Sequence, residues 1–212
     1  LQKDFYSNPL VIPALIHILQ SHPSQQIRQL AGVEARKLIT REWYDSGSIS
    51  DESKAQIRAS LLSSTLAEQD ALVRHTSSRV ITAIASYDIE EGEWSELLPA
   101  LHQAATSSVV AEREVSVYIL YTLLEAQLEP LEPLTNNLIE LFSKTLADPE
   151  SLAVRVSTLE ALGCIANNFE TATEPEGLEQ SIDAFRRLVP AMVEVLKQVI
   201  TARDEKSANQ VF

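Results

Sequence analysis

Residues 26–43 read QIRQLAGVEARKLITREW. The apolar residues of this stretch recur at the spacing of one helix face, which predicts a single amphipathic helix. The face consists of Ile27, Leu30, Ala31, Ala35 and Leu38. Because Ala31, Gly32 and Ala35 are small, we expect another helix backbone to pack very close to this one. Leu30 is expected to lie in the core.

The composition restricts the class of protein. The chain has 212 residues, of which 45% are hydrophobic, enough for a sizeable core. Only 5 glycines and 5 phenylalanines argue against an all-β fold. The sequence contains no run of eighteen apolar residues, so it predicts no transmembrane helix. Cys164 is the single cysteine, so an internal disulfide is impossible, which suits a reducing compartment.

The chain is strongly acidic. Its formal net charge is -13 and its pI is about 4.7. This charge disfavours direct contact with nucleic acid phosphates and favours basic partners. An acidic surface that serves solubility alone is the open alternative.

A pattern of about 40–47 residues recurs along the chain. Aliphatic–arginine pairs open apolar-periodic runs at Ile27-Arg28, Val73-Arg74 and Val154-Arg155. A fourth run covers 112–124, and with Ser116 at the arginine-equivalent position the offsets are 46, 42 and 39 residues. Second helical segments lie between these runs, several of them with an internal proline. These prolines are Pro13, Pro99 and Pro190.

Two helices per recurring unit are typical of HEAT and armadillo arrays. We therefore predict an all-α fold, a HEAT-repeat α-solenoid of stacked antiparallel helix pairs. The array is expected to form one domain over 1–212 with about five repeats. Its expected divisions are a partial repeat at 1–22, repeats at 23–67, 68–108, 109–148 and 149–202, and the start of a sixth at 203–212.

The predicted helices within these repeats are 9–20, 24–41, 51–66, 70–87, 93–106, 111–126, 134–146, 151–169, 181–201 and 204 onward. Residues 1–6 are read as the tail of a helix, and both ends of the chain look cut, so we expect a piece of a longer superhelix. Arg28, Arg74 and Arg155 lie at the start of the first helices of the second, third and fifth repeats, and each can reach an acidic group in the adjoining turn. We interpret them as an inter-repeat polar ladder with a structural role.

Catalytic and metal-binding motifs are scarce. The sequence has no glycine-rich phosphate loop and no paired cysteines. Its four histidines are scattered over separate repeats, at His17, His22, His75 and His102. Cys164 lies in an apolar stripe with Leu159 and is expected to be a buried small hydrophobe, as Leu159 is expected to be a core residue. We expect no enzyme activity, no metal site and no cofactor.

Three further features bear on function. Trp43 and Trp94 lie at the turns between paired helices, where a large ring can anchor the packing. Arg36, Lys37 and Arg41 form a local basic cluster near the end of the first helix of the second repeat, where cations also complement the helix dipole. The segment 171–179 is acidic and reads as an exposed linker.

The order FYSNP, IPALIHILQ, IRQLAGVEARKLI, W, IRASLL, VRHTSSRVITAIA, EWSELLPAL resembles the amino-terminal HEAT repeats of the importin-β (karyopherin-β) superfamily, nearest the importin-four branch. The resemblance covers the whole chain and is most specific at 29–43 and 93–98. It implies a nuclear import receptor that shuttles between cytoplasm and nucleus. The implied partners are Ran-GTP, FG-repeat nucleoporins and basic cargo such as histones and ribosomal proteins.

In that family these first repeats form the end that grips Ran-GTP, second helices line the concave face, and FG repeats contact the outer face between first helices. The resemblance makes Arg36, Lys37, Arg41, Trp43 and Glu96 candidate Ran-binding residues. The family often has Lys-Asn where this chain has Arg36-Lys37, so this chain keeps a cation but lacks the amide side chain.

Two other classes of protein remain open. A HEAT-repeat scaffold would share the periodicity, and a chaperone for basic proteins would share the acidity. Neither would depend on Ran.

Overall fold

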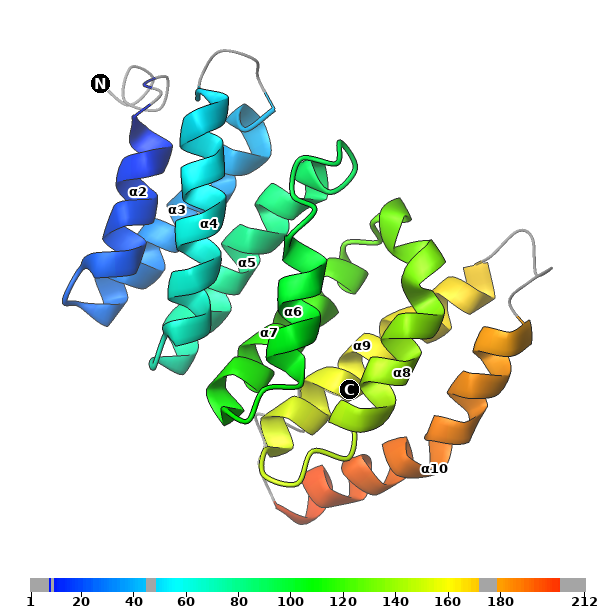
Figure 1. The fold of residues 1–212 in the computed structure, drawn as a ribbon. Helices are drawn as coiled ribbons and strands as arrows, with labels where there is room; N and C mark the ends of the chain where they lie inside the picture. The colour runs from blue at the N-terminus through cyan, green and yellow to red at the C-terminus, as the bar shows by residue number, and fades with distance from the viewer. Residues whose placement is uncertain (1–7, 9, 45–48, 172–178, 203–212) are drawn as a thin grey trace. The chain divides into compact units, whose positions relative to one another are not determined.

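The computed structural model describes residues 8, 10–44, 49–171 and 179–202, and in these ranges every regular element is a helix (Figure 1). The predicted all-α class is confirmed. The expected helices at 1–6 and from 204 onward, and most of the expected linker 171–179, lie outside the described residues. No helix in the described ranges is long and apolar enough to cross a membrane.

The elements follow one another with short connections. They are α2 (Val11–Ser21), α3 (Gln25–Glu42), α4 (Asp51–Ala67), α5 (Ala71–Asp88), α6 (Leu97–Ala105), α7 (Val110–Glu125), the 3-10 helix η1 (Glu129–Leu134), α8 (Thr135–Thr145), α9 (Leu152–Thr171) and α10 (Glu179–Thr201). With the exception of α6, each predicted helix begins and ends within two residues of the observed one. The sequence pattern did not predict η1.

The predicted start of α6 was wrong by four residues, because residues 93–96 form a turn rather than a helix. The backbone N–H groups of Glu93 and Trp94 both donate to the carbonyl of Asp88, at 2.7 and 3.3 Å. Gly92 has a φ of 74°, which a residue with a Cβ rarely adopts. The chain therefore doubles back around the end of α5 before α6 begins.

The chain divides into two compact units, Leu1–Pro99 and Ala100–Phe212. In unit 1, α3 packs on α5, α2 packs on α3 and α4, and α4 packs on α5. In unit 2, α7 packs on α9, and α8 and α10 pack on α9 and on each other. Each unit thus has a layer of first helices, which are α3 and α5 or α7 and α9, and a layer of second helices (Figure 1).

The core face of α3 differs from the predicted one at its edge. Ala31, Ala35 and Leu38 are buried as expected, but Leu30 is 61% exposed and Ile27 is 44% exposed, so the expectation for Leu30 was wrong. Successive residues of a helix point about 100° apart, and Leu30 immediately precedes Ala31. The face that meets α2 and α5 is centred on Ala31, Gly32, Ala35 and Ile39, which turns Leu30 outward.

The close approach expected at the small residues of α3 is present. A Cβ atom built on Gly32 would overlap the Thr76 methyl group of α5 and come within 3.2 Å of Leu19 Cδ1 of α2. Leu159 in α9 is buried, as predicted. Trp43 and Trp94 are both buried, which agrees with their expected role as packing anchors.

Candidate functional site

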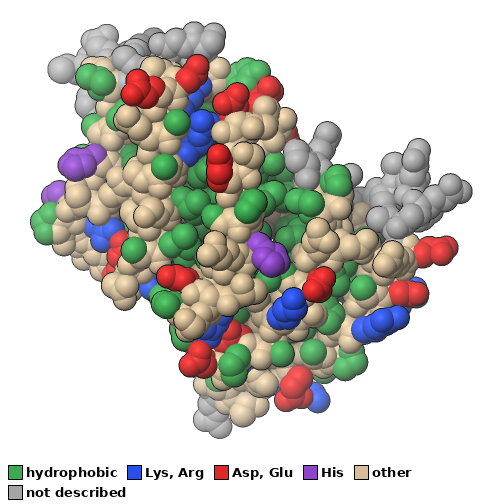
Figure 2. Space-filling view, in the orientation of Figure 1, with side chains coloured by type: hydrophobic (Ala, Val, Ile, Leu, Met, Phe, Trp, Pro, Cys, Tyr) green, Lys and Arg blue, Asp and Glu red, His purple; other side chains and the backbone are tan. Residues whose placement is uncertain are grey.

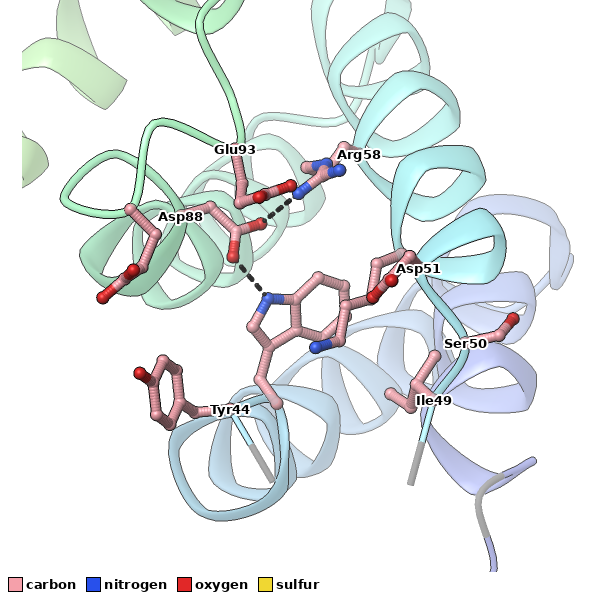
Figure 3. A pocket seen from close by; sticks show the side chains of 10 residues that line it. Tyr44, Ile49, Ser50, Asp51, Arg58, Asp88 and Glu93 are labelled. Carbon is pink, nitrogen blue, oxygen red and sulfur yellow. Dashed lines mark hydrogen bonds and ion pairs between the residues drawn. The ribbon is translucent and has the colours of Figure 1, made fainter. Parts of the chain in front are cut away.

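Trp43 lies just past the end of α3 and is only 1% exposed. Its ring Nε1–H donates a hydrogen bond of 2.8 Å to Asp88 Oδ1 at the end of α5 (Figure 3). The other carboxylate oxygen of Asp88 accepts a 2.9 Å hydrogen bond from Arg58 Nη1 of α4. One buried carboxylate therefore joins three helices of unit 1, while its backbone carbonyl holds the turn after α5.

Asp88 and Arg58 were not among the predicted site residues, although one signal in the sequence points to Asp88. A buried indole N–H nearly always finds an acceptor. Asp88 lies 45 residues after Trp43, about one repeat length, and follows the predicted helix 70–87 directly. Position within the repeat would therefore have singled it out as the acceptor.

A cavity of about 710 Å³ opens beside this junction (Figure 3). Its lining residues come from the ends of α3 and α5, the start of α4 and the turn after α5. They are Trp43, Tyr44, Ile49, Ser50, Asp51, Lys54, Arg58, Asp88, Glu91 and Glu93. Lys54 Nζ lies 5.6 Å from the centroid of the Trp43 ring, a cation–π contact.

Acidic side chains predominate around this cavity. Glu91 and Glu93 are exposed, and neither has an ion pair in the described ranges. Acidic side chains gather around the end of unit 1 where α4 begins, with cations between them (Figure 2). Among the described residues that line the cavity, none is arranged as a nucleophile beside a base. The described lining can hold polar or cationic groups of a partner.

The structure places the five predicted Ran-binding residues in different environments. Arg36, Lys37 and Arg41 are exposed on α3, where Lys37 Nζ pairs with Glu34 at 2.7 Å and Arg41 with Glu42 at 3.2 Å. Glu96 is exposed in the turn before α6, and Trp43 is buried. The structure therefore groups only the three cations, on a helix of the first layer. The assignment to Ran stays a prediction.

The arginines predicted to form a ladder share one position. Arg28, Arg74 and Arg155 are each the fourth residue of a first-layer helix. Arg28 donates through Nε to the carbonyl of Leu19 at 2.7 Å and pairs through Nη2 with Glu68. Arg74 Nη1 donates to the carbonyls of Glu68 and Gln69 at 3.0 and 3.1 Å, and Arg155 Nη1 donates to the carbonyl of Asp148.

Ser116 was the wrong choice for the fourth repeat, because Arg113 is the fourth residue of α7. Arg113 Nε and Nη2 bind Asp148 at 2.6 and 3.3 Å, and Nη2 also binds Glu150 at 2.8 Å. Ser116 instead donates to the carbonyl of Leu101 at 2.5 Å and is fully buried. The aliphatic–arginine rule missed Arg113 because Glu112 precedes it.

Two of the carboxylates that meet these arginines, those of Asp148 and Glu68, are stabilised in the charged form. Burial opposes ionisation of Asp148, but the hydrogen bonds from Arg113 and from the N–H groups of Ser151 and Glu150 hold its pKa below the ordinary value. The pKa of Glu68 is lowered in the same way, since the hydrogen bonds from Arg28 and from the N–H of Asp70 outweigh the effect of burial. Both carboxylates are therefore ionised at neutral pH.

The described part of the chain holds no group of three or more His, Cys, Asp or Glu side chains placed to bind a metal ion. Cys164 is only partly buried, less than expected. Burial, aided by Glu125 and Glu160, raises the pKa of its thiol. Cys164 is therefore a protonated thiol at neutral pH rather than an activated nucleophile.

Two family models match the chain from end to end. Residues 69–212 match the model described as IPO5-like, TPR repeats, and residues 1–67 match the importin-beta N-terminal domain. This chain belongs to the importin-β family. Its relatives include the probable importin subunit beta-4 of Schizosaccharomyces pombe, at 35% identity over 100% of this chain and 19% of the relative. Importin-4 of Mus musculus is 25% identical over 94% of this chain and 17% of its own length.

The fold is also that of solved karyopherins. Kap121p bound to the SUMO protease Ulp1p superposes with a TM-score of 0.70 at 22% identity, over 100% of this chain and 19% of that one. Kap121p bound to RanGTP gives 0.68 at 22% identity, over 96% and 18%. The predicted family, and with it the solenoid class, is confirmed. The chain spans about one fifth of these relatives. Its relatives are importins, in agreement with the expectation that it is no enzyme.

Proposed function

We propose that this chain is the amino-terminal part of a nuclear import receptor that binds Ran-GTP and FG-repeat nucleoporins and carries basic proteins such as histones and ribosomal proteins through nuclear pores. The match of 1–67 to the importin-beta N-terminal domain is the observation that carries this proposal. A solved relative, Kap121p, is described as bound to RanGTP. The receptor would shuttle between cytoplasm and nucleus.

Charge supports the proposed partners. A chain with a net charge of -13 attracts basic cargo at long range. The cations Arg36, Lys37 and Arg41 are exceptions on this acidic surface, and the side chain of Arg36 has no hydrogen bond or ion pair within the described ranges. An exposed cation that forms no ion pair with the described residues is available to an acidic surface of another protein.

An apolar patch on the first-layer helices supports contact with FG repeats. Gln25 Nε2 of α3 donates to Asp70 Oδ1 at the start of α5 at 3.0 Å, so the two helices begin side by side. Ile27 and Leu72 lie within the first turn of these helices and are 44% and 48% exposed, and Leu30 follows one turn after Ile27. We name Ile27, Leu30 and Leu72 the α3–α5 patch. Phenylalanine side chains can bury exposed apolar surface of this kind.

The decisive experiment measures binding of the full-length protein to Ran loaded with GTP or GDP. A receptor that releases cargo on Ran-GTP binding must prefer the GTP form, because coupling requires differential affinity. We expect the variant Arg36→Glu/Lys37→Glu to bind Ran-GTP about tenfold more weakly or worse, since charge complementarity becomes repulsion.

The matched control is Arg186→Glu/Arg187→Glu, which changes the net charge equally at two adjacent exposed residues of α10. It should leave Ran-GTP affinity unchanged. Equal loss in both variants would mean that only the overall charge matters. Equal affinity of the unaltered protein for both nucleotide forms would favour a scaffold, or a chaperone for basic proteins, that works without Ran.

A further inference from the structure

The cavity beside Trp43 already holds two cations of its own chain, each against a matching group (Figure 3). Arg58 Nη1 donates to Asp88 Oδ2 at 2.9 Å. Lys54 Nζ lies 5.6 Å from the centroid of the Trp43 ring. The described lining thus uses both means by which proteins hold a cation, a carboxylate and an aromatic face.

A second set of the same groups lines the cavity and is not used within the described chain. The carboxylates of Asp51, Glu91 and Glu93 are exposed, and none forms an ion pair with the described residues. Tyr44 also lines the cavity and is 65% exposed. Together with Asp88, four carboxylates share the described lining with two cations, so negative charge is in excess.

The structure holds these unused groups in place. In the turn after α5, the backbone N–H of Glu91 donates to the carbonyl of Tyr87 at 3.2 Å, and that of Glu93 donates to the carbonyl of Asp88 at 2.7 Å. The Tyr44 ring packs on the Tyr87 ring with centroids 6.1 Å apart, and the Tyr87 hydroxyl donates to a backbone carbonyl of α3. A site that is ordered before its ligand arrives binds at a lower entropic cost.

The size and chemistry of the cavity select the ligand. Its volume of about 710 Å³ lies within the range of pockets for small ligands, enough for a long side chain and its backbone. The described residues form no cluster placed to bind a metal ion, so the matching ligand is an organic cation. A guanidinium fits better than an ammonium, because its planar group stacks on an aromatic ring and donates two parallel hydrogen bonds to a carboxylate.

We propose that this cavity binds an arginine side chain from an extended basic segment of another protein. Tyr44 is the ring on which the guanidinium stacks, and Glu91 and Glu93 supply the carboxylates that accept its hydrogen bonds. The net charge of -13 draws basic segments toward the chain, and the cavity selects arginine among their side chains. The site requires neither Ran-GTP nor FG repeats, so it goes beyond the proposed function and is tested without them.

The two tryptophans of the chain give a direct readout of binding. Trp43 lines the cavity and Trp94 does not, so the NMR signal of the Trp43 indole N–H reports on the site and that of Trp94 is the internal reference. The probe is the peptide Ser-Gly-Arg-Gly-Arg-Gly-Ser, added to the 212-residue chain. It should shift the Trp43 signal saturably and leave the Trp94 signal unchanged. The same peptide with neutral citrulline in place of arginine should not shift either signal, and a lysine peptide should bind at least threefold more weakly.

Variants of the lining test the assigned residues. Glu91→Gln/Glu93→Gln should weaken binding of the arginine peptide about fivefold or more. Tyr44→Ser should weaken it about two- to fivefold, and Tyr44→Phe should retain it, since the ring remains. The matched control is Glu52→Gln/Glu90→Gln, which removes the same charge from exposed residues nearby that do not line the cavity. This control should leave the affinity within twofold.

Four results would overturn the proposal. They are the absence of a saturable shift at Trp43, equal binding of the citrulline peptide, equal binding of the lysine peptide, and an equal loss of affinity in the control and in Glu91→Gln/Glu93→Gln. The last result would mean that the peptide responds only to the overall charge of the chain.

Discussion

Gly32 of α3 lies against Thr76 of α5 so closely that a Cβ atom on residue 32 would overlap the threonine methyl group. Leu19 of α2 closes the other side, with Cδ1 at 3.2 Å from the same position. The two contacts explain why glycine stands in the middle of this helix, where alanine would otherwise be favoured by about 1 kcal/mol. Because α2, α3 and α5 approach one another closely here, the position requires a residue without a Cβ atom.

Gly32→Ala should therefore destabilise the chain, because overpacking costs about 1–3 kcal/mol and outweighs the gain in helix propensity. Gly163→Ala is the matched control. Gly163 also lies inside a helix, α9, but a Cβ atom there meets nothing within 4 Å. Chemical denaturation should show Gly163→Ala equal to or more stable than the unaltered chain. Equal stability of the two variants would contradict the steric explanation.

Replacing Trp43 tests the junction at Asp88. Trp43→Phe removes the ring N–H that donates to Asp88 Oδ1 and leaves a buried acceptor with one partner fewer. Trp94→Phe removes a comparable part of a buried ring that has no hydrogen bond to the described residues. We expect Trp43→Phe to cost about 1–3 kcal/mol more than Trp94→Phe in the free energy of unfolding. Equal costs would mean that the hydrogen bond contributes nothing.

Much of the fold followed from local signals, and the errors share a physical cause. The spacing of apolar residues located the helices, and the small size of Ala31, Gly32 and Ala35 predicted the close packing. The outward turn of Leu30 and the start of α6 depend on neighbours distant in sequence. Leu30 faces away because α2 and α5 meet the other side of α3, and α6 begins late because the carbonyl of Asp88 holds Glu93 and Trp94.

The site was harder to predict than the fold. Local pattern selected Arg28, Arg74 and Arg155 but passed over Arg113, whose partner Asp148 lies 35 residues away. The local pattern singled out Trp43 but not Asp88 or Arg58. A hydrogen bond between the ends of two helices does not change the apolar spacing within either helix, so the pattern cannot reveal it. The binding role of exposed residues such as Arg36 and Lys37 is set by the partner molecule and not by packing within the chain.

The Arg113–Asp148 pair should make stability sensitive to acid. The folded-state pKa of Asp148 lies below its ordinary value of 3.8, so the unfolded chain binds the proton more tightly. The stabilisation is then fully present above about pH 4 and is lost as the pH falls through the folded-state pKa. Glu68 adds a contribution of the same sign below its ordinary pKa of 4.5.

Asp148→Asn tests this assignment. It leaves Arg113 buried with a weaker partner, so we expect a loss of about 3–5 kcal/mol at pH 7, which shrinks toward pH 2 as the unaltered chain loses the same contact. Asp183→Asn, in the exposed 3.0 Å pair with Arg186, should change stability by less than about 1 kcal/mol. Thermal melts between pH 2 and 7 give both curves. A loss for Asp148→Asn that stays constant down to pH 2 would rule out the ion pair as its source.

The last prediction concerns the α3–α5 patch, and it rests on the proposed contact with FG repeats. Leu30 and Leu72 are 61% and 48% exposed, so Leu30→Ser/Leu72→Ser should change stability by no more than about 0.5 kcal/mol per residue. Burying a leucine side chain contributes about 1.5–3 kcal/mol, so loss of both should weaken binding of an FG-repeat peptide by tenfold or more.

Val189→Ser/Val193→Ser is the control for that measurement, because both valines are 43% exposed on α10, a second-layer helix. Fluorescence anisotropy of a labelled FG-repeat peptide against the 212-residue chain compares the two variants directly. If the peptide binds through the first-layer helices, only the leucine variant loses affinity. Equal loss in both would indicate general surface hydrophobicity, and unchanged binding in the leucine variant would remove the α3–α5 patch from the proposed function.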